Sequence, residues 1–249
     1  MAPPPISVNE CSLTAGHHCS GGWPKSANDC LLNAVTTDPA PASAPGTPGV
    51  RSAQKQASRR ALLDAALGLL ERQNLSGLGV REVTRAAGLS PAAFYRHFAD
   101  LAELGVVLVR ESLANLHEMV RAVFAGSGEA ELLIDRSVGV IAAHVAAHPA
   151  YIRFLARERH GGVKPVRDAV AAELACFAEE LAGLLAVQPD TAGWSAADRR
   201  MLAELYVDRM VSTALALVEA DGAERAAIAR TARTQLRLIN LGSRHWTAD

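Results

Sequence analysis

Aromatic side chains are scarce in this chain of 249 residues, since Phe, Trp and Tyr together make up 4% of it. Long apolar runs are also missing, because no stretch reaches the ~18–20 residues that a helix needs to cross a bilayer. The N-terminus lacks the basic segment followed by an apolar one that is typical of a secretory signal. These absences predict a cytoplasmic protein with no membrane partner.

Cysteine is equally rare, and three of the four cysteines lie in the first thirty residues. This distribution does not suit a disulfide framework. The tail does combine possible zinc ligands, but their spacing matches no familiar short zinc motif and their flanks offer no core to fix ligands. These residues are Cys11, His17, His18, Cys19 and Cys30. We therefore expect no metal and no cofactor.

Catalytic signatures are missing too. The sequence has no glycine-rich phosphate loop, no GxSxG and no HExxH, and its Ser, His and Asp residues are scattered without a supporting motif. The sequence therefore predicts a protein that is not an enzyme.

What the chain does have is alanine and leucine at helical spacing, which predicts an all-α fold. Its charge is unevenly distributed. Residues 51–100 carry eight Lys/Arg against four Asp/Glu, a balance of +4, although the whole chain has a net charge of −1. A basic segment in a nearly neutral protein indicates where nucleic acid would bind.

Three regions follow from the pattern along the chain. Residues 1–50 are rich in Pro, Gly, Ser and Thr and lack periodicity, so they are predicted to be a disordered tail. Residues 51–100, here called the head, are predicted to bind DNA, with a first helix from about 58 to 74. Residues 101–249, here called the body, contain one long helix from Asp100 to about Phe124 and then four or five more. The body is predicted to sense a ligand and to form a homodimer.

The stretch VREVTRAAGLSPAAFYRHF, residues 80–98, predicts a helix-turn-helix. Gly88 suits the left-handed residue that ends the first helix. Ser90 can cap the second helix, with Pro91 at its first position. Phe94 and Phe98 then face the core, which leaves a small, polar and basic face for the DNA major groove. A plain helical hairpin is the alternative, because this spacing alone is a weak signal.

The head resembles the DNA-binding domain of the TetR family of transcriptional regulators, above all in the run FYRHF. The resemblance extends into the body through FYRHFADLAELG, IRFLARERHGG, VRDAVAAELACFAEELAGLL and QLRLINLGSRHW. These stretches are similar to the subgroup containing FabR and DesT, repressors of unsaturated fatty acid synthesis and desaturation that respond to acyl thioesters. The resemblance implies a TetR-like fold and a repressor of lipid metabolism genes with a long-chain acyl-CoA effector. Ala99 departs from the pattern, because many relatives carry Lys or Arg there.

Ten head residues are candidate DNA contacts. Arg59 and Arg60 precede the motif and are expected at phosphates; Arg81 and Thr84, or Arg85 instead, are expected at the backbone. Ser90, Ala92 and Ala93 can approach base edges, and Arg96 can read guanine or contact a phosphate. The family resemblance implies phosphate contacts for Tyr95 and His97. Because a single motif reads few base pairs, we expect a palindromic double-stranded operator and a homodimer.

The dimer interface is predicted on the last two helices. Its apolar residues are Leu202, Leu205, Met210, Leu215, Leu217, Ile228, Leu236 and Ile239. In the body, Arg153 and Arg157 are candidate contacts for CoA phosphates, although salt bridges with nearby acidic residues are an equal alternative. Phe177 is a candidate for the wall of an acyl cavity. His144 and His148 have metal-ligand spacing but no evident third ligand.

Two other functions remain open. One is a TetR-type repressor of an efflux pump that senses hydrophobic drugs, against which the few aromatics argue mildly. The other is a helical acyl-binding protein without an operator, against which the basic head argues.

Overall fold

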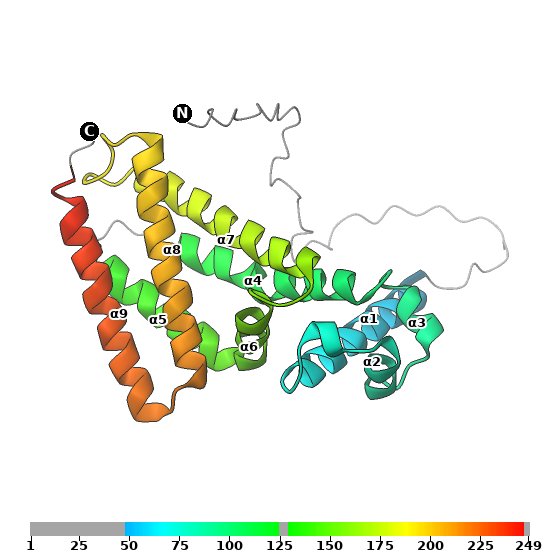
Figure 1. The fold of residues 1–249 in the computed structure, drawn as a ribbon. Coiled ribbons are helices and arrows are strands. Elements are labelled where there is room, and N and C mark those ends of the chain that lie inside the picture. Colours follow the sequence, from blue (N-terminus) through cyan, green and yellow to red (C-terminus); the bar gives the residue numbers. More distant parts are fainter. Residues whose placement is uncertain (1–47, 125–128, 247–249) are drawn as a thin grey trace, which may run out of the picture. The chain divides into compact units, whose positions relative to one another are not determined.

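The computed structural model describes residues 48–124 and 129–246, and every regular element in these ranges is helical (Figure 1). The head contains α1 (Pro48–Leu70), a 3-10 turn η1 (Leu75–Gly77), α2 (Val80–Ala86) and α3 (Pro91–Tyr95). The body contains α4 (Leu101–Phe124), α5 (Ala130–Ala147), α6 (Pro149–Glu158), α7 (Lys164–Leu185), α8 (Ala196–Glu219) and α9 (Gly222–Ser243). The predicted all-α class is confirmed.

The turn chemistry of the head agrees with the sequence. Gly88 has φ = 66°, a conformation that costs a side-chain-bearing residue more than glycine. The Ser90 hydroxyl accepts a hydrogen bond of 3.3 Å from the Ala93 N–H and so caps α3. At the start of α4, Asp100 accepts from the Glu103 N–H at 2.8 Å, and the Glu103 carboxylate accepts from the Ala99 N–H at 2.6 Å. These caps fix where α3 and α4 begin.

The first helix is longer at its N-terminus than predicted. It begins at Pro48 instead of near Ser58, so the last three residues of the predicted disordered tail belong to α1. The segment RSAQKQAS is rich in good helix formers but has no apolar stripe. Hydrophobic periodicity therefore does not predict that it is helical. The rest of the predicted tail, with its cysteines and histidines, lies outside the described residues.

The core of the head continues into the body without a break. Leu63, Val83, Phe94 and Phe98 share one hydrophobic cluster with buried residues of α4, α6 and α7. Gly105 of α4 marks the closest approach, because a Cβ there would lie 2.5 Å from Leu75 Cδ2 and 2.7 Å from Val166 Cγ2. The described residues accordingly belong to a single compact unit, residues 47–249. The division into head and body remains a proposal about function.

Within the described ranges, no single helix is long and apolar enough to cross a membrane. Taken together, α5 and α6 have the length and apolar composition of a membrane span, but the two helices meet at a bend of 98°.

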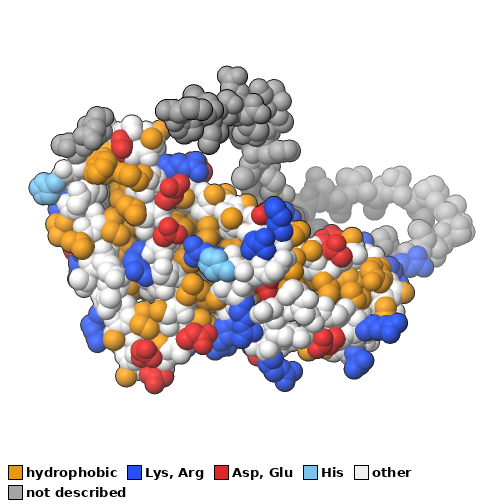
Figure 2. All heavy atoms as spheres, viewed as in Figure 1, with side chains coloured by type: hydrophobic (Ala, Val, Ile, Leu, Met, Phe, Trp, Pro, Cys, Tyr) orange, Lys and Arg blue, Asp and Glu red, His pale blue; other side chains and the backbone are white. Residues whose placement is uncertain are grey.

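The last two helices, α8 and α9, pack side by side (Figure 1). Three of the residues predicted to lie in a dimer interface are buried inside the protomer instead: Leu202, Leu217 and Leu236. Each faces the chain's own core, because α8 packs on α5 and α7 as well as on α9. The large apolar residues left exposed on α8, on α9 and just beyond them are Met201, Leu205, Leu238, Leu241 and Trp246, and orange side chains over α8 and α9 are visible in Figure 2.

Candidate functional site

The two helices of the helix-turn-helix leave a polar and basic surface exposed. Tyr95 is 60% exposed although it directly follows the fully buried Phe94. Arg81, Arg85 and Arg96 are exposed, as are Ser90 and Ala92 at the start of α3. A short capped helix that presents small residues first and Tyr-Arg next offers both base-edge and phosphate contacts.

His97 lies at the centre of a cationic group. Its side chain is half-buried, and its Nδ1 atom is buried without a hydrogen-bond partner among the described residues. Burial lowers the pKa of His97, and the neighbouring positive charges of Lys55, Arg96 and Arg59 lower it further. The imidazole is therefore kept neutral beside three cations from α1 and the end of α3. Such a group favours an incoming phosphate.

Two candidate DNA contacts lie in the wrong place for that role. Thr84 is 2% exposed, and its hydroxyl donates to the Arg81 carbonyl of its own helix at 3.2 Å. Ala93, expected to face outward, is 3% exposed because adjacent positions 93 and 94 of the short α3 both turn towards the other head helices. In this conformation neither side chain can reach DNA, which leaves Arg81 and Arg85 as the outward groups of α2.

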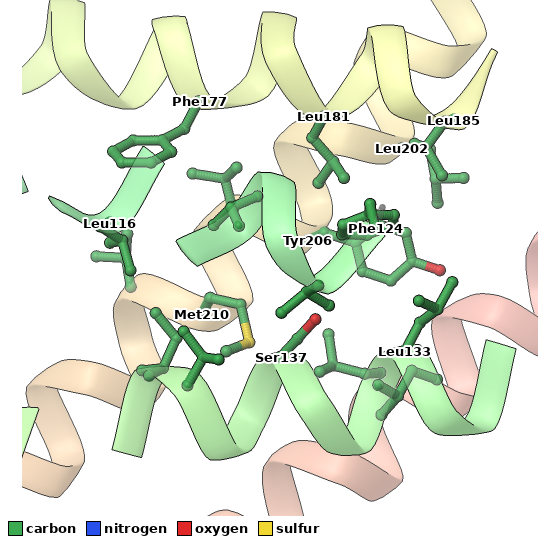
Figure 3. A pocket seen from close by; sticks show the side chains of 18 of the residues that line it. Leu116, Phe124, Leu133, Ser137, Phe177, Leu181, Leu185, Leu202, Tyr206 and Met210 are labelled. Atoms are coloured by element: carbon green, nitrogen blue, oxygen red, sulfur yellow. The ribbon is translucent and has the colours of Figure 1, made fainter. Parts of the chain in front are cut away.

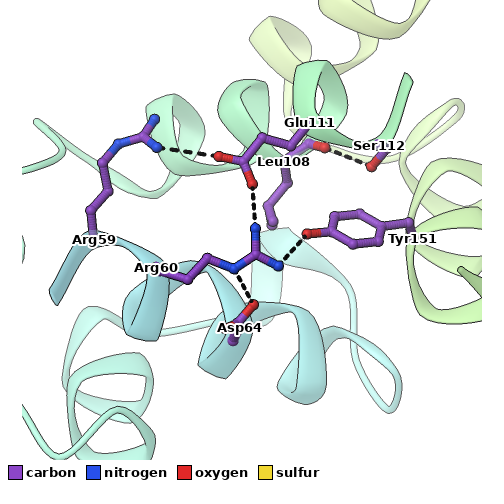
Figure 4. Close-up of polar contacts among 7 residues, drawn as sticks. All are labelled: Arg59, Arg60, Asp64, Leu108, Glu111, Ser112 and Tyr151. Atoms are coloured by element: carbon purple, nitrogen blue, oxygen red, sulfur yellow. Dashed lines mark hydrogen bonds and ion pairs between the residues drawn. The ribbon is translucent and has the colours of Figure 1, made fainter. Parts of the chain in front are cut away.

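Arg59 and Arg60 are not free either (Figure 4). Arg59 pairs with Glu111 of α4 at 3.2 Å and lies over the Phe98 ring, 5.5 Å from its centroid. Arg60 pairs with Asp64 at 2.9 Å and with Glu111 at 3.3 Å, and it donates to the Tyr151 hydroxyl at 3.5 Å. The hydrogen bond to Asp64 is the largest of the interactions that raise the pKa of Arg60. Both arginines therefore connect the head to the body, and a phosphate would have to compete with Glu111.

This arrangement predicts different salt dependences for two arginines. We expect Arg96→Gln to flatten the slope of log K against log salt by about 1, because one phosphate contact contributes about −0.9. Arg60→Gln should change the slope less, because its partners are carboxylates. Fluorescence anisotropy of an operator fragment at several salt concentrations measures both slopes. Equal flattening by the two variants would return Arg60 to the DNA contacts.

The body encloses a large apolar cavity of about 640 Å³. Figure 3 shows its walls closing in from several helices, with Leu116 and Phe124 of α4, Leu133 of α5, Phe177 and Leu181 of α7, and Met210 of α8 pointing inward. A cavity of this size is within the range of small-molecule sites, and walls that are mostly aliphatic favour an apolar chain.

The predicted ligand residues divide between wall and exterior. Phe177 lines the cavity, and its ring stacks on His117 with centroids 3.7 Å apart. Arg153 and Arg157 are not in the wall, and each is already bonded within the protein: Arg153 to the Val218 carbonyl at 3.5 Å, and Arg157 to the Leu70 carbonyl at 2.6 Å. Each of these bonds uses one nitrogen of the guanidinium, so a contact of Arg153 or Arg157 with CoA phosphates outside the cavity stays a prediction.

A different arginine of the same run, Arg159, does reach the wall. Its guanidinium pairs with Asp208 at 3.6 Å, and Arg244 at another part of the lining pairs with Asp190 at 3.2 Å. Sequence spacing could not separate Arg159 from Arg153 and Arg157, because the end of α6 decides which side chain turns inward. No group of three or more His, Cys, Asp or Glu side chains in residues 48–124 and 129–246 could hold a metal ion.

Residues 62–104 match the family model of bacterial regulatory proteins of the tetR family. The match covers α2, α3, the turn between them and the start of α4, and so coincides with the exposed basic surface.

Solved structures with the same fold come from several regulators. The fatty acid degradation regulator FadR from Bacillus halodurans is 15% identical with a TM-score of 0.61, over 72% of this chain and 94% of that chain. FadR from Bacillus subtilis in complex with stearoyl-CoA is 14% identical with a TM-score of 0.59, over 72% and 96%. NalD, the secondary repressor of the MexAB-OprM multidrug efflux pump in Pseudomonas aeruginosa, is 18% identical with a TM-score of 0.57, over 76% and 97%.

At these identities the likeness establishes a common fold and not a common ligand. These proteins are regulators, in agreement with the prediction that the chain is not an enzyme. Residues 62–104 thus match the tetR family of bacterial regulatory proteins, and the chain as a whole shares the fold of these solved regulators.

Proposed function

We propose that this protein represses genes of fatty acid or lipid metabolism and is controlled by long-chain acyl-CoA. The observation that carries the proposal is the cavity of about 640 Å³, whose walls are mostly aliphatic. A similar fold binds stearoyl-CoA in FadR from Bacillus subtilis, which supports the choice of ligand class. The acyl chain would occupy the cavity and the CoA group would remain outside it, because both lining arginines are already paired.

The DNA-binding form is proposed to be a homodimer on a palindromic operator. The exposed apolar residues of α8 and α9 and Trp246 beyond them are the candidate interface. A dimer would bring two copies of the Tyr95–Arg96–His97 surface to successive major grooves. DNA contacts are accordingly proposed for Arg81, Arg85, Ser90, Ala92, Tyr95, Arg96 and His97.

Helix α6 connects cavity and head. Ile152, Leu155 and Arg159, at its end, line the cavity. On its other side, the Glu158 carboxylate is 1% exposed and accepts a hydrogen bond of 2.9 Å from the Leu75 N–H of η1. A ligand that shifts α6 would therefore shift the support on which the DNA-binding helices rest.

Titration with thioesters tests the proposal. We expect palmitoyl-CoA and oleoyl-CoA to bind at micromolar concentration and to change operator affinity, whereas free CoA should not. The change is bounded by the ligand's differential affinity for the two states, typically about 5–150-fold. Isothermal titration calorimetry measures binding, and a mobility shift on an operator selected from the protein's own genome measures the effect on DNA.

The likeness to NalD keeps an efflux repressor as the second candidate. If neither thioester binds while a cationic dye does, lipid control is wrong and drug sensing replaces it. If thioesters bind and no genomic DNA fragment is retained at low salt, the protein is an acyl-binding protein without an operator.

A further inference from the structure

One of the polar side chains in the cavity wall is a deeply buried histidine. His144 lies on α5 between the apolar lining residues Ile141 and Val145, and it is only 4% exposed. Its Nε2 atom is buried and has no hydrogen-bond partner among the described residues. A buried polar atom without a partner is costly. Because His144 belongs to the wall of the cavity, a ligand group that enters the wall beside the ring would supply the missing partner.

The state of this imidazole limits what that partner can be. Burial lowers the pKa of His144, and the nearby His148 lowers it further, so the ring is neutral at pH 7. A hydrogen bond with the backbone of Ser112 has the opposite effect and raises the pKa of His144, as expected when the ring donates to a carbonyl oxygen. We assign the donor to Ser112 as Nδ1, because Nε2 has no partner among the described residues. In a neutral ring Nε2 is then an acceptor and requires a donor such as a hydroxyl.

Two further neutral groups lie in the same wall. Ser137 is seven residues before His144, which places it on the same face of α5 about 10 Å away along the helix axis. The Tyr206 hydroxyl and the Ser137 hydroxyl are visible among the side chains of Figure 3. Burial raises the pKa of Tyr206 to about 12, which keeps the phenol protonated. In the described part of the chain neither hydroxyl has a hydrogen-bond partner.

The cations of the cavity wall are already paired. Arg159 and Arg244, the arginines of the lining, are paired with Asp208 and Asp190. An ionised carboxylate or phosphate would find no unpaired cation in the wall. For an acyl chain, recognition inside the cavity therefore depends on neutral hydrogen bonds.

We propose that the preferred effector is a hydroxylated acyl chain, whose hydroxyl donates a hydrogen bond to Nε2 of His144. This inference rests on the proposed acyl-CoA function and narrows its ligand class. A plain alkyl chain would fill the same space but would leave Nε2 unsatisfied. A site built to hydrogen-bond a hydroxyl discriminates strongly against the analogue that lacks it.

Matched pairs of thioesters test this directly. The probes are palmitoyl-CoA with β-hydroxypalmitoyl-CoA, and oleoyl-CoA with ricinoleoyl-CoA, which place the hydroxyl near the thioester and in mid-chain. We expect one hydroxylated member to bind about tenfold more tightly than its parent, the effect of one additional hydrogen bond. Calorimetry on the full chain measures the dissociation constants.

Two variants on α5 assign the preference. His144→Leu should abolish the discrimination, because leucine cannot hydrogen-bond to the hydroxyl and leaves the wall apolar. His148→Leu is the matched control: this residue is one turn further on and outside the cavity lining, so the preference should persist. Circular dichroism melting confirms that both variants fold.

The outcomes separate the two proposals. If parents and hydroxylated chains bind equally, or if His144→Leu keeps the preference, the hydroxyl inference is overturned and acyl-CoA control stands. If none of the four thioesters binds, acyl-CoA control is overturned and this inference with it.

Discussion

Replacing Phe94 with alanine is expected to lower the free energy of unfolding by about 3–5 kcal/mol, the usual cost of removing a fully buried aromatic ring. Phe94 is 0% exposed and packs against Phe98 with ring centroids 5.6 Å apart. It belongs to the cluster that extends from α1 into α4, α6 and α7, so the defect should be felt beyond the head. Urea unfolding followed by circular dichroism, at one fixed protein concentration, measures the change.

An exposed leucine provides the control for Phe94. Leu132 on α5 is 45% exposed, so Leu132→Ala should change the free energy of unfolding by less than about 0.5 kcal/mol. A loss below about 1 kcal/mol for Phe94→Ala would contradict the continuous core.

The second large effect is expected on DNA binding. The double variant Tyr95→Ala, Arg96→Gln should lose at least about 100-fold in operator affinity, because hydrogen bonds to charged groups contribute about 1.5–3 kcal/mol each. Both side chains are exposed, so the melting temperature should stay nearly constant. Fluorescence anisotropy at a fixed salt concentration measures the affinity.

Arg230→Gln is the matched charge control, since Arg230 is exposed on α9. It should leave operator affinity within about twofold. A comparable loss in both variants would mean that general charge, and not the α3 surface, controls binding.

The local features of the head could be predicted from the sequence. Gly88, Ser90 and Asp100 act over three or four residues, and each forms the turn or cap that its side chain favours. Phe94 and Phe98 are buried as their spacing indicates. The N-terminal boundary of α1 could not be predicted, because the helix extends through a polar segment without an apolar stripe.

Partners far apart in the sequence could not be predicted. Arg59 and Arg60 meet Glu111 across about fifty residues, and no spacing rule connects them. Arg157 contacts the head whereas Arg159 lines the cavity, because the position of α6 determines where each side chain lies. His144 had a metal-like spacing to His148, but the two rings, 5.0 Å apart, have no third ligand in the described residues. The tertiary fold gives these residues their roles.

The ten-residue helix α6 contacts both the cavity and η1. If an effector acts through α6 as proposed, thermodynamic linkage makes the regulation reciprocal: the factor by which the effector changes operator affinity must equal the factor by which the operator changes effector affinity. A chain bound to its operator would therefore respond to a different effector concentration than a free one. In a cell, operator-bound and free protein would therefore respond over two ranges of effector concentration. The ratio between these ranges would equal the coupling factor carried through Glu158 and its neighbours.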